Sequence, residues 1–294
     1  RNWLSDVEPR RGGFRGYTRT MKTFDTGIVA WSPGREEMGY HFDFPGSALE
    51  KLVESGPGGE VPTLWLVWRV LAHGGHLTRI DVAIDDYAGV LDMGSVLGAV
   101  DAGNWVARWA GVAVYRGVGK EGECTSSGVT FGGGKSESLL RIYDKRIERI
   151  QVGKVPADCL PGHWIRVELQ LRGKRAHAMG LRILEAGVEV ISEVAGIIYG
   201  YLDFKSPGSG NKQKYRWPTA VWWSDFLGGV KKARLCVPKR ETSDVDRVKW
   251  LVEQVGPSLE WLETGKGQAA LAAYLDGSPD YTRVRVGKQL VEVG

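Results

Sequence analysis

Three segments of this sequence carry charged and phenolic side chains at every second position. They are RIDVAIDDY at 79–87, SLLRIYDK at 138–145 and HWIRVELQLR at 163–172. Because side chains alternate between the two faces of a β-strand, each segment would have one apolar and one polar face. The simplest alternative is an antiparallel sheet with one solvent-exposed face. The polar faces would carry Arg79, Asp81, Asp85, Arg141, Tyr143, Lys145, Arg166, Glu168 and Arg172.

Two of these segments repeat the form arginine, any residue, acid: Arg79-Ile80-Asp81 and Arg166-Val167-Glu168. If the two strands are neighbours, two carboxylates converge on one sheet surface beside a tyrosine and a lysine. Carboxylate oxygens favour Mg²⁺ or Mn²⁺. Such an ion would polarise a phosphodiester and ease deprotonation of a nearby phenol, whose ordinary pKa is about 10. Lys145 would stabilise charge on the phosphate or on the leaving oxygen.

A second concentration of charge lies near the C-terminus. Residues 205–240 contain nine Lys or Arg and a single acid, Asp225, with five Tyr, Trp or Phe between them. Basic charge with interleaved aromatic rings is typical of single-stranded DNA binding. The alternative is a solvated basic face over a tryptophan-filled core. The residues predicted to contact DNA are Arg79, Arg141, Arg166 and Arg172 on the strands, and Lys212, Lys214, Arg216, Lys231, Lys232 and Arg234 here.

Hydrophobic periodicity predicts the elements that position these residues. Besides the three polar strands, we expect strands at 23–31, 39–44, 112–119, 128–131 and 233–237. Helices are expected at 48–54, 65–72, 93–103, 174–185, 188–201, 217–229, 245–255 and 258–276. This mixed order predicts an α+β fold: a large, mostly antiparallel sheet with helices on one face and a C-terminal helical segment. The predicted domains are a basic arm (1–22), a catalytic domain (23–204) and a basic, tryptophan-rich and helical C-terminal region (205–294) packed on it.

Composition excludes several classes of protein. The chain has 294 residues, of which 43% are apolar and 25% charged, with a net charge of +4, so it is neither disordered nor fibrous. Cys124, Cys159 and Cys236 lie far apart, which argues against a disulfide scaffold or a zinc ribbon. No apolar run is long enough to span a bilayer, and we expect a cytoplasmic protein that does not bind membranes. The segment GGGKS at 132–136 lacks the spacing of an ATP-binding phosphate loop.

The motifs together resemble a known family. RIDVAIDDY, SESLLRIYDKRIE at 136–148 and RVELQLR at 166–172 are similar to the replication initiation factors of the Rep_trans type. This family comprises rolling-circle plasmid initiators and related relaxases of conjugative elements. WPTAVWWSDFL at 217–227 and KWLVEQVGPSLEWL at 249–262 resemble its usual tail, so the resemblance covers roughly residues 23–265.

The resemblance implies a site-specific, single-strand DNA endonuclease and strand transferase. Tyr143 would be the nucleophile, leaving a 5′-phosphotyrosine link and a free 3′-OH. Asp81 and Glu168 would hold Mg²⁺ or Mn²⁺, with Asp85 as a third ligand. The five histidines do not form the His-hydrophobe-His motif of the better-known nicking enzymes, so a carboxylate site is the consistent alternative.

The expected partner is DNA, namely an origin stem-loop whose nick site is single-stranded. A host helicase and a second copy of the chain are further candidate partners. Two other functions remain open: a non-catalytic DNA-binding regulator of the same fold, and a metal-dependent nuclease that uses water as its nucleophile.

Overall fold

The computed structural model describes residues 8–10, 13–55, 62–153, 155–208, 210–236, 264, 266, 283–286 and 289–292. The chain divides into two compact units, Arg1–Val237 and Pro238–Gly294. In the second unit, β12 (Arg283–Val286) pairs antiparallel with β13 (Gln289–Glu292). The predicted helix at 245–255 lies outside the described residues, and only residues 264 and 266 of the one predicted at 258–276 are described, so the predicted C-terminal helical segment stays a prediction.

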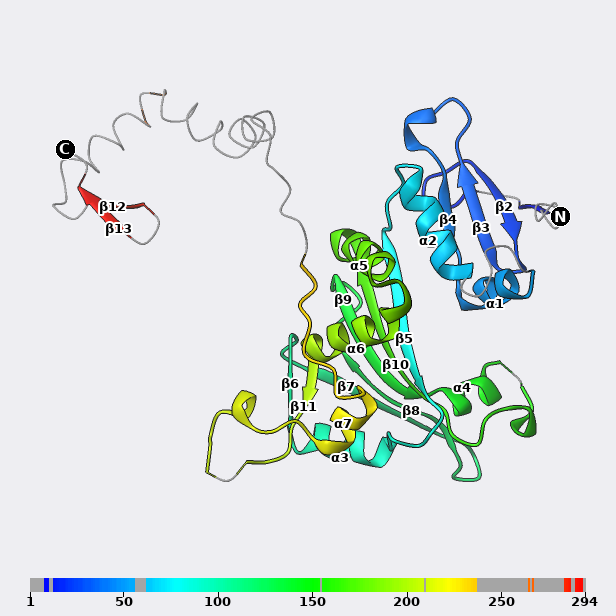
Figure 1. The fold of residues 1–294 in the computed structure, drawn as a ribbon. Helices are drawn as coiled ribbons and strands as arrows, with labels where there is room; N and C mark the ends of the chain where they lie inside the picture. The colour runs from blue at the N-terminus through cyan, green and yellow to red at the C-terminus, as the bar shows by residue number, and fades with distance from the viewer. Residues whose placement is uncertain are drawn as a thin grey trace. The chain divides into compact units, whose positions relative to one another are not determined.

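A five-stranded sheet organises the first unit (Figure 1). Every neighbouring pair is antiparallel, which confirms the predicted α+β class and the predicted mostly antiparallel sheet. The two strands with the Arg-x-acid pattern are neighbours, as the metal hypothesis required. In spatial order the strands are β5 (Arg79–Asp86), β10 (Ile165–Arg172), β9 (Ser138–Asp144), β8 (Cys124–Phe131) and β7 (Val112–Val118).

The apolar face of this sheet forms the main hydrophobic core. Figure 1 shows α5 (Gly173–Ala186) and α6 (Val190–Tyr201) lying over it, and α3 (Met93–Asp101) packs against β8. Asp92 begins α3 by accepting a hydrogen bond from the backbone N–H of Ser95. Because the helices cover this face, the alternate side chains of the strands remain on the other face. The buried residues of the covered face include Val129, Phe131, Leu140, Ile142, Val167, Leu169 and Leu171.

The N-terminal residues form a separate sheet within the same unit. Its strands, in sequence and spatial order, are β1 (Glu8–Arg10), β2 (Arg19–Thr23), β3 (Gly27–Trp31) and β4 (His41–Asp43). A short 3₁₀ turn (Glu36–Met38) precedes β4, and α1 (Gly46–Ser55) and α2 (Pro62–Ala72) follow it. Residues 1–22 were expected to be a basic arm, but their described part supplies β1 and most of β2. Thr20 and Thr23 are buried there, a pattern hidden by the Arg- and Gly-rich composition.

The segment after α6 belongs to the first unit, so the predicted boundary at 204/205 differs from the observed one. β11 (Leu202–Phe204) pairs with β6 (Trp105–Ala107), and neither strand was predicted. The helix predicted at 217–229 is reduced to α7 (Val221–Phe226). The described part of the strand predicted at 233–237 is irregular, because it packs on a helix rather than a sheet: the Ala233 N–H donates to the Gly196 carbonyl of α6 at 2.8 Å.

The described fold also includes the short helix α4 (Lys145–Gln151) and three further 3₁₀ turns. The 3₁₀ turns lie at Ala157–Cys159, Gly187–Glu189 and Lys214–Arg216. Among the residues that the structure describes, none of the helices has the length and apolar character needed to span a membrane.

Candidate functional site

Tyr143 lies near the end of β9, where the chain turns from strand to helix. Asp144 stops the strand and begins α4 (Lys145–Gln151) by accepting a hydrogen bond from the Ile147 N–H at 2.8 Å. Lys145 is therefore the first residue of α4, whereas the sequence predicted it on the strand face. It still lies near the phenol: its Nζ is 5.7 Å from the centre of the Tyr143 ring, and it forms an ion pair with Glu148.

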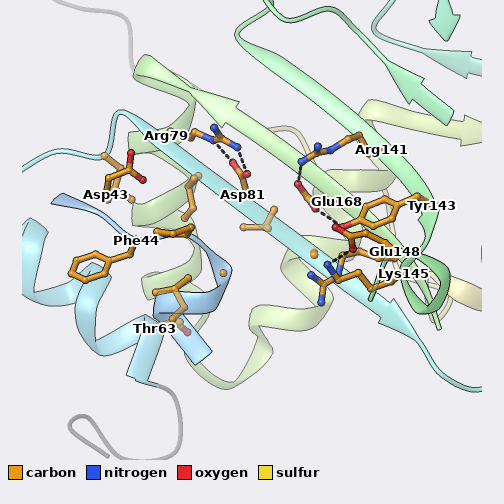
Figure 2. A pocket seen from close by; sticks show the side chains of 18 of the residues that line it. Asp43, Phe44, Thr63, Arg79, Asp81, Arg141, Tyr143, Lys145, Glu148 and Glu168 are labelled. Atoms are coloured by element: carbon orange, nitrogen blue, oxygen red, sulfur yellow. Dashed lines mark hydrogen bonds and ion pairs between the residues drawn. The ribbon is translucent and has the colours of Figure 1, made fainter. Parts of the chain in front are cut away.

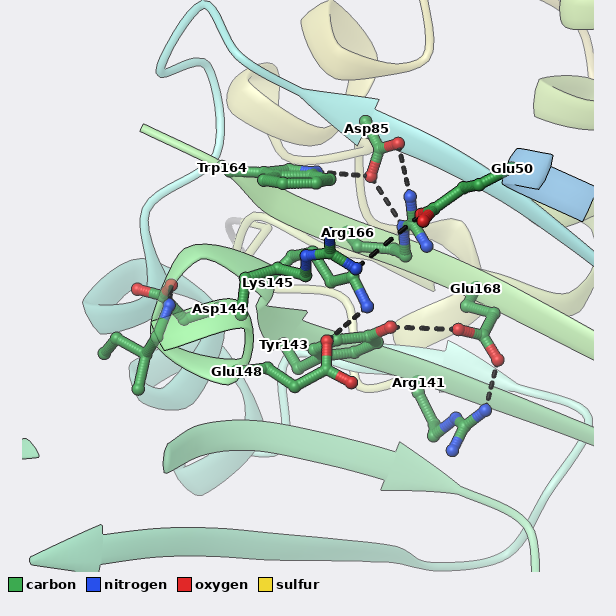
Figure 3. A network of polar contacts seen from close by, with 12 residues as sticks. Glu50, Asp85, Arg141, Tyr143, Asp144, Lys145, Glu148, Trp164, Arg166 and Glu168 are labelled. Carbon is green, nitrogen blue, oxygen red and sulfur yellow. Dashed lines mark hydrogen bonds and ion pairs between the residues drawn. The ribbon is translucent and has the colours of Figure 1, made fainter. Parts of the chain in front are cut away.

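The strand register places the polar residues in two adjacent rows across the sheet. Arg166 lies directly between Asp85 on β5 and Tyr143 on β9. In the next row, Glu168 lies between Ala83 and Arg141. Side chains at directly opposite positions share a face and approach each other closely. The predicted polar face therefore exists, and its charged residues meet there (Figure 3).

Glu168 joins the phenol to an arginine. The Tyr143 hydroxyl donates to Glu168 Oε2 at 3.0 Å, and Arg141 Nη2 forms an ion pair with Glu168 Oε1 (Figure 3). Tyr143 is 9% exposed and Glu168 is 8% exposed. Burial, together with the negative charges of Glu168 and Glu148, raises the pKa of the Tyr143 phenol, and the charge of Arg166 opposes this rise. The phenol is thus held in place but stays protonated at neutral pH.

A glycine leaves room for a second tyrosine beside this network. Gly128 lies between Tyr143 and Tyr115 in the register. A Cβ atom at Gly128 would lie 2.3 Å from the Tyr115 hydroxyl and 2.8 Å from the Ile142 carbonyl. Any larger residue at position 128 would therefore displace the Tyr115 side chain from the polar face.

The polar face opens into a cavity of about 810 Å³ (Figure 2). Its other wall comes from β4, α1 and α2 and includes Phe42, Phe44 and Leu49. Asp85 and Arg172, which the sequence also nominated, are not among the residues that line it. The nominated residues that do line it are Arg79, Asp81, Arg141, Tyr143, Lys145, Arg166 and Glu168.

The three nominated metal ligands are each bonded to protein groups. Asp81 accepts two hydrogen bonds from Arg79, at 2.9 and 2.6 Å, and Glu168 is bonded to Tyr143 and Arg141. Within the described ranges, no group of three His, Cys, Asp or Glu side chains is placed to hold a metal ion. Asp81 and Glu168 lie diagonally on neighbouring strands and line the cavity, so this pair fits a magnesium or manganese ion in its chemistry.

The basic residues after position 204 lie away from this cavity, whose lining contains none of them. Lys232 forms an ion pair with Asp203, and Lys214 Nζ donates to the Gly103 carbonyl at 2.7 Å. The Arg216 guanidinium lies over the Tyr215 ring, 5.5 Å from its centre. Lys239 and Arg240, the last two basic residues of the 205–240 segment, lie outside the described residues. Lys212, Lys231 and Arg234 have no hydrogen-bond or ion-pair partner within the described part of the chain.

Sequence reasoning missed three residues of the site. Trp164 donates from Nε1 to Asp85 at 2.7 Å, and the same period-two alternation that nominated Arg166 places Trp164 on its face. The sequence could have indicated Glu148, because it lies three residues after Lys145, a spacing at which oppositely charged side chains meet on a helix. No sequence pattern indicated Tyr115, because only the register of β7, β8 and β9 brings it near Tyr143.

Comparisons with known proteins agree with this architecture. A family model described as replication initiation factor matches residues 75–274. The chain is 28% identical over 193 residues to the putative DNA relaxase NicK of Bacillus subtilis (strain 168), a match that covers 65% of this chain and 53% of that protein. The chain therefore spans about half the length of this curated relative.

A solved structure shares the fold. It is that of a rolling circle replication initiator protein from Geobacillus stearothermophilus, with a TM-score of 0.63 and 23% identity, covering 79% of this chain and 85% of that one. The N-terminal sheet, β1 to β4, and the helices α1 and α2 precede the family match. Because the family model matches more than half of the 294 residues and includes all five strands of the main sheet, this chain belongs to the replication initiation factor family.

Proposed function

We propose that this protein is a site-specific DNA nicking and strand-joining enzyme, acting as a rolling-circle initiator or a conjugative relaxase. The observation that supports this most directly is the position of Tyr143. Its hydroxyl is hydrogen-bonded to Glu168 at 3.0 Å, and both residues line a cavity of about 810 Å³. A buried phenol beside a carboxylate and several arginines has the components that a phosphoryl-transfer nucleophile needs.

The proposed reaction is an in-line transesterification. The Tyr143 oxygen forms a bond to phosphorus while the bond from phosphorus to the 3′ oxygen breaks. The phenol proton passes to Glu168, and the departing 3′ oxygen takes a proton from solvent. The products are a 5′-phosphotyrosine link and a free 3′-OH, and attack by a 3′-OH on that link reseals the strand.

The cations of the cavity offset the charge that develops on the phosphate. Because burial raises the pKa of Tyr143, the phenolate is scarce at neutral pH and needs this support. Arg141 lies beside Glu168 and Arg166 lies beside Tyr143, so both lie on the reacting side of the sheet. The Lys145 ammonium group, near the phenol ring, adds to the positive potential at this end of β9.

Asp81 and Glu168 are the residues that would hold Mg²⁺ or Mn²⁺. Such an ion would supply positive charge to the phosphate oxygens. A ligand that binds only the folded state raises the melting temperature. We expect Mn²⁺ to raise the melting temperature of the full chain and expect the Asp81→Asn variant to lose this increase. An equal increase in the variant would contradict the assignment of Asp81.

The nucleophile is tested by covalent trapping. The full chain is incubated with Mn²⁺ and a 3′-labelled stem-loop oligonucleotide that carries the nick site, because the 3′-side fragment is the one that becomes linked to the tyrosine, and a denaturing gel separates any protein–DNA adduct. Tyr143→Phe should abolish the adduct, while the matched variant Tyr115→Phe, changed in the same cavity, should retain it. An adduct in Tyr143→Phe would overturn the assignment of Tyr143.

The same gel separates the alternative functions. Cleavage without an adduct would indicate a nuclease that uses water. DNA binding without cleavage, in the unmodified chain, would indicate a non-catalytic regulator. Either result would overturn the proposed strand transfer.

A further inference from the structure

The guanidinium of Arg166 is held along one edge only. Its Nε donates to Asp85 Oδ1 and its Nη2 to Asp85 Oδ2, each at 2.7 Å, in the paired geometry that arginine forms with a carboxylate. Its Nη1 has no hydrogen-bond partner among the residues that the structure describes. Three of the five N–H groups of this half-buried arginine, two on Nη1 and one on Nη2, therefore remain available to a ligand.

The free edge lies at the proposed site of reaction. Arg166 is directly opposite Tyr143 in the strand register, and both residues line the cavity. A phosphate attacked by the Tyr143 oxygen would have its non-bridging oxygens next to this arginine. Because arginine is always charged and presents N–H groups in a planar fork, it suits an oxygen on which negative charge increases.

Asp85 lies behind the arginine rather than in the cavity. Arg166 lines the cavity and Asp85 does not, whereas Asp81, four residues earlier on the same strand, does. Both Asp85 oxygens accept hydrogen bonds from Arg166, and Oδ1 accepts a further one from Trp164 Nε1 at 2.7 Å (Figure 3). Because Asp85 also lies outside the cavity lining, it is placed to orient the arginine rather than to bind a substrate or an ion in the cavity.

Trp164 completes the support. The Arg166 Cζ lies over the Trp164 ring, 5.7 Å from the ring centre, and the centre of the Tyr87 ring lies 5.4 Å from that of the indole, with the two planes tilted by 43°. The arginine is therefore restrained by a paired hydrogen bond and by an aromatic surface. Restraint of this kind removes the entropy cost of ordering a long side chain at the moment of reaction.

We propose that Arg166 is a catalytic residue whose free N–H groups bind the phosphate attacked by Tyr143, and that Asp85 and Trp164 are positioning residues that hold it. This inference rests on the proposed nicking activity and changes the role expected for Asp85, which the sequence nominated as a metal ligand. It predicts that Asp85 influences the reaction through Arg166 and has no effect on metal affinity.

The test uses single-turnover cleavage of the stem-loop oligonucleotide by the full chain, with and without added guanidinium ion. Arg166→Ala should slow adduct formation by about 10²–10³, the range seen when one such donor is removed. Guanidinium should restore part of this loss. Arg166→Lys, which keeps the charge but not the fork, should remain slow and should not respond. The matched control Arg182→Ala, which breaks an arginine–glutamate pair between α5 and α6, should be unchanged in both conditions.

The role of Asp85 is tested in parallel. Asp85→Asn should slow adduct formation by about tenfold or more at saturating DNA, since losing the support around a positioned group has costs of this order. It should leave the Mn²⁺-dependent rise in melting temperature unchanged, whereas Asp81→Asn should lose it. Circular dichroism of each variant confirms that it is folded.

Three results would be decisive. Absence of any guanidinium rescue in Arg166→Ala would overturn the catalytic role of Arg166. Loss of the Mn²⁺ effect in Asp85→Asn would overturn its positioning role and restore it as a metal ligand. Failure of the unmodified chain to form an adduct would instead overturn the proposed function itself, so the two failures are distinguishable.

Discussion

The polar face of the five-stranded sheet and the basic segment at residues 205–236 both concentrate charge, but the charges have different surroundings. On the polar face, Arg141, Arg166 and Glu168 surround a tyrosine and face a cavity. In the basic segment, the Lys205 side chain is 5% exposed and bonded to Asp203 at 2.6 Å. Charge density in a sequence therefore does not reveal whether a charge meets a ligand or stabilises the fold.

Counter-charges explain the difference. Asp203 is 1% exposed and is bonded to two lysines, Lys205 and Lys232, and to the Thr219 hydroxyl. This cluster joins β11 to the segment that follows it. The polar-face arginines also have carboxylate partners, but Arg166 keeps a free edge toward the cavity. An arginine in an ion pair can therefore still bind a ligand when some of its N–H groups have no partner.

The largest expected effect is on the polar face. Glu168→Gln keeps the size of the side chain but removes the charge that accepts the Tyr143 proton. Loss of a general base of this kind costs about 10²–10⁴ in rate, so single-turnover cleavage by the folded variant should fall by about 10³. Glu137→Gln is the matched control, because the Glu137 side chain is 71% exposed and lies outside the cavity. A Glu168→Gln variant that cleaves at the normal rate would contradict the functional role proposed for the polar face.

The second prediction concerns stability. Asp203→Asn leaves the buried Lys205 ammonium without its counter-charge, and breaking a buried pair costs about 3–5 kcal/mol. Urea unfolding should show this loss, while the folded fraction should cleave DNA at close to the normal rate. A large loss of cleavage with normal stability would place this cluster in the functional site after all.

The third prediction concerns the carboxylate of Asp86, at the end of β5, where we expect a smaller effect on stability. Burial opposes ionisation of Asp86, but the hydrogen bonds it accepts from Leu91, Val90 and Ala88 lower its pKa below the ordinary value. A lowered pKa in the folded state stabilises the protein above the unfolded value, about 3.9, and this contribution disappears as the pH falls through the folded pKa.

We therefore expect Asp86→Asn to lower the free energy of unfolding by about 1–3 kcal/mol at pH 7. The difference from the unmodified chain should shrink below about pH 4, where the aspartate is itself protonated. Unfolding by urea at a series of pH values measures both quantities. A difference that stays constant down to pH 2 would contradict the lowered pKa.

The smallest expected effect tests the free lysines of the basic segment. Lys212 and Lys231 are exposed and have no partner within the described residues. If both contact phosphates, replacing them with Gln should reduce the slope of log affinity against log salt by about one to two. Melting temperature should not change. An unchanged slope would show that the basic segment has a structural role only, in contrast to the functional role proposed for the polar face.

Much of the fold follows from local patterns. The period-two alternation predicted β5, β9 and β10 and the division of each into a polar and an apolar face. Helical periodicity predicted α3, α5 and α6. Patterns failed where long-range packing decides the outcome: β6 and β11 are three residues each and pair across 95 or more residues of chain, so neither has a local signal.

The sequence by itself determined which residues share a face, because the alternation of side chains along a strand is a property of the backbone. It nominated Tyr143, Arg166 and Glu168 on that basis. Only the tertiary structure decided what each one touches, because contacts across a sheet depend on strand order and register. The register places Arg166 between Asp85 and Tyr143, so Asp85 holds an arginine rather than facing the cavity beside Asp81.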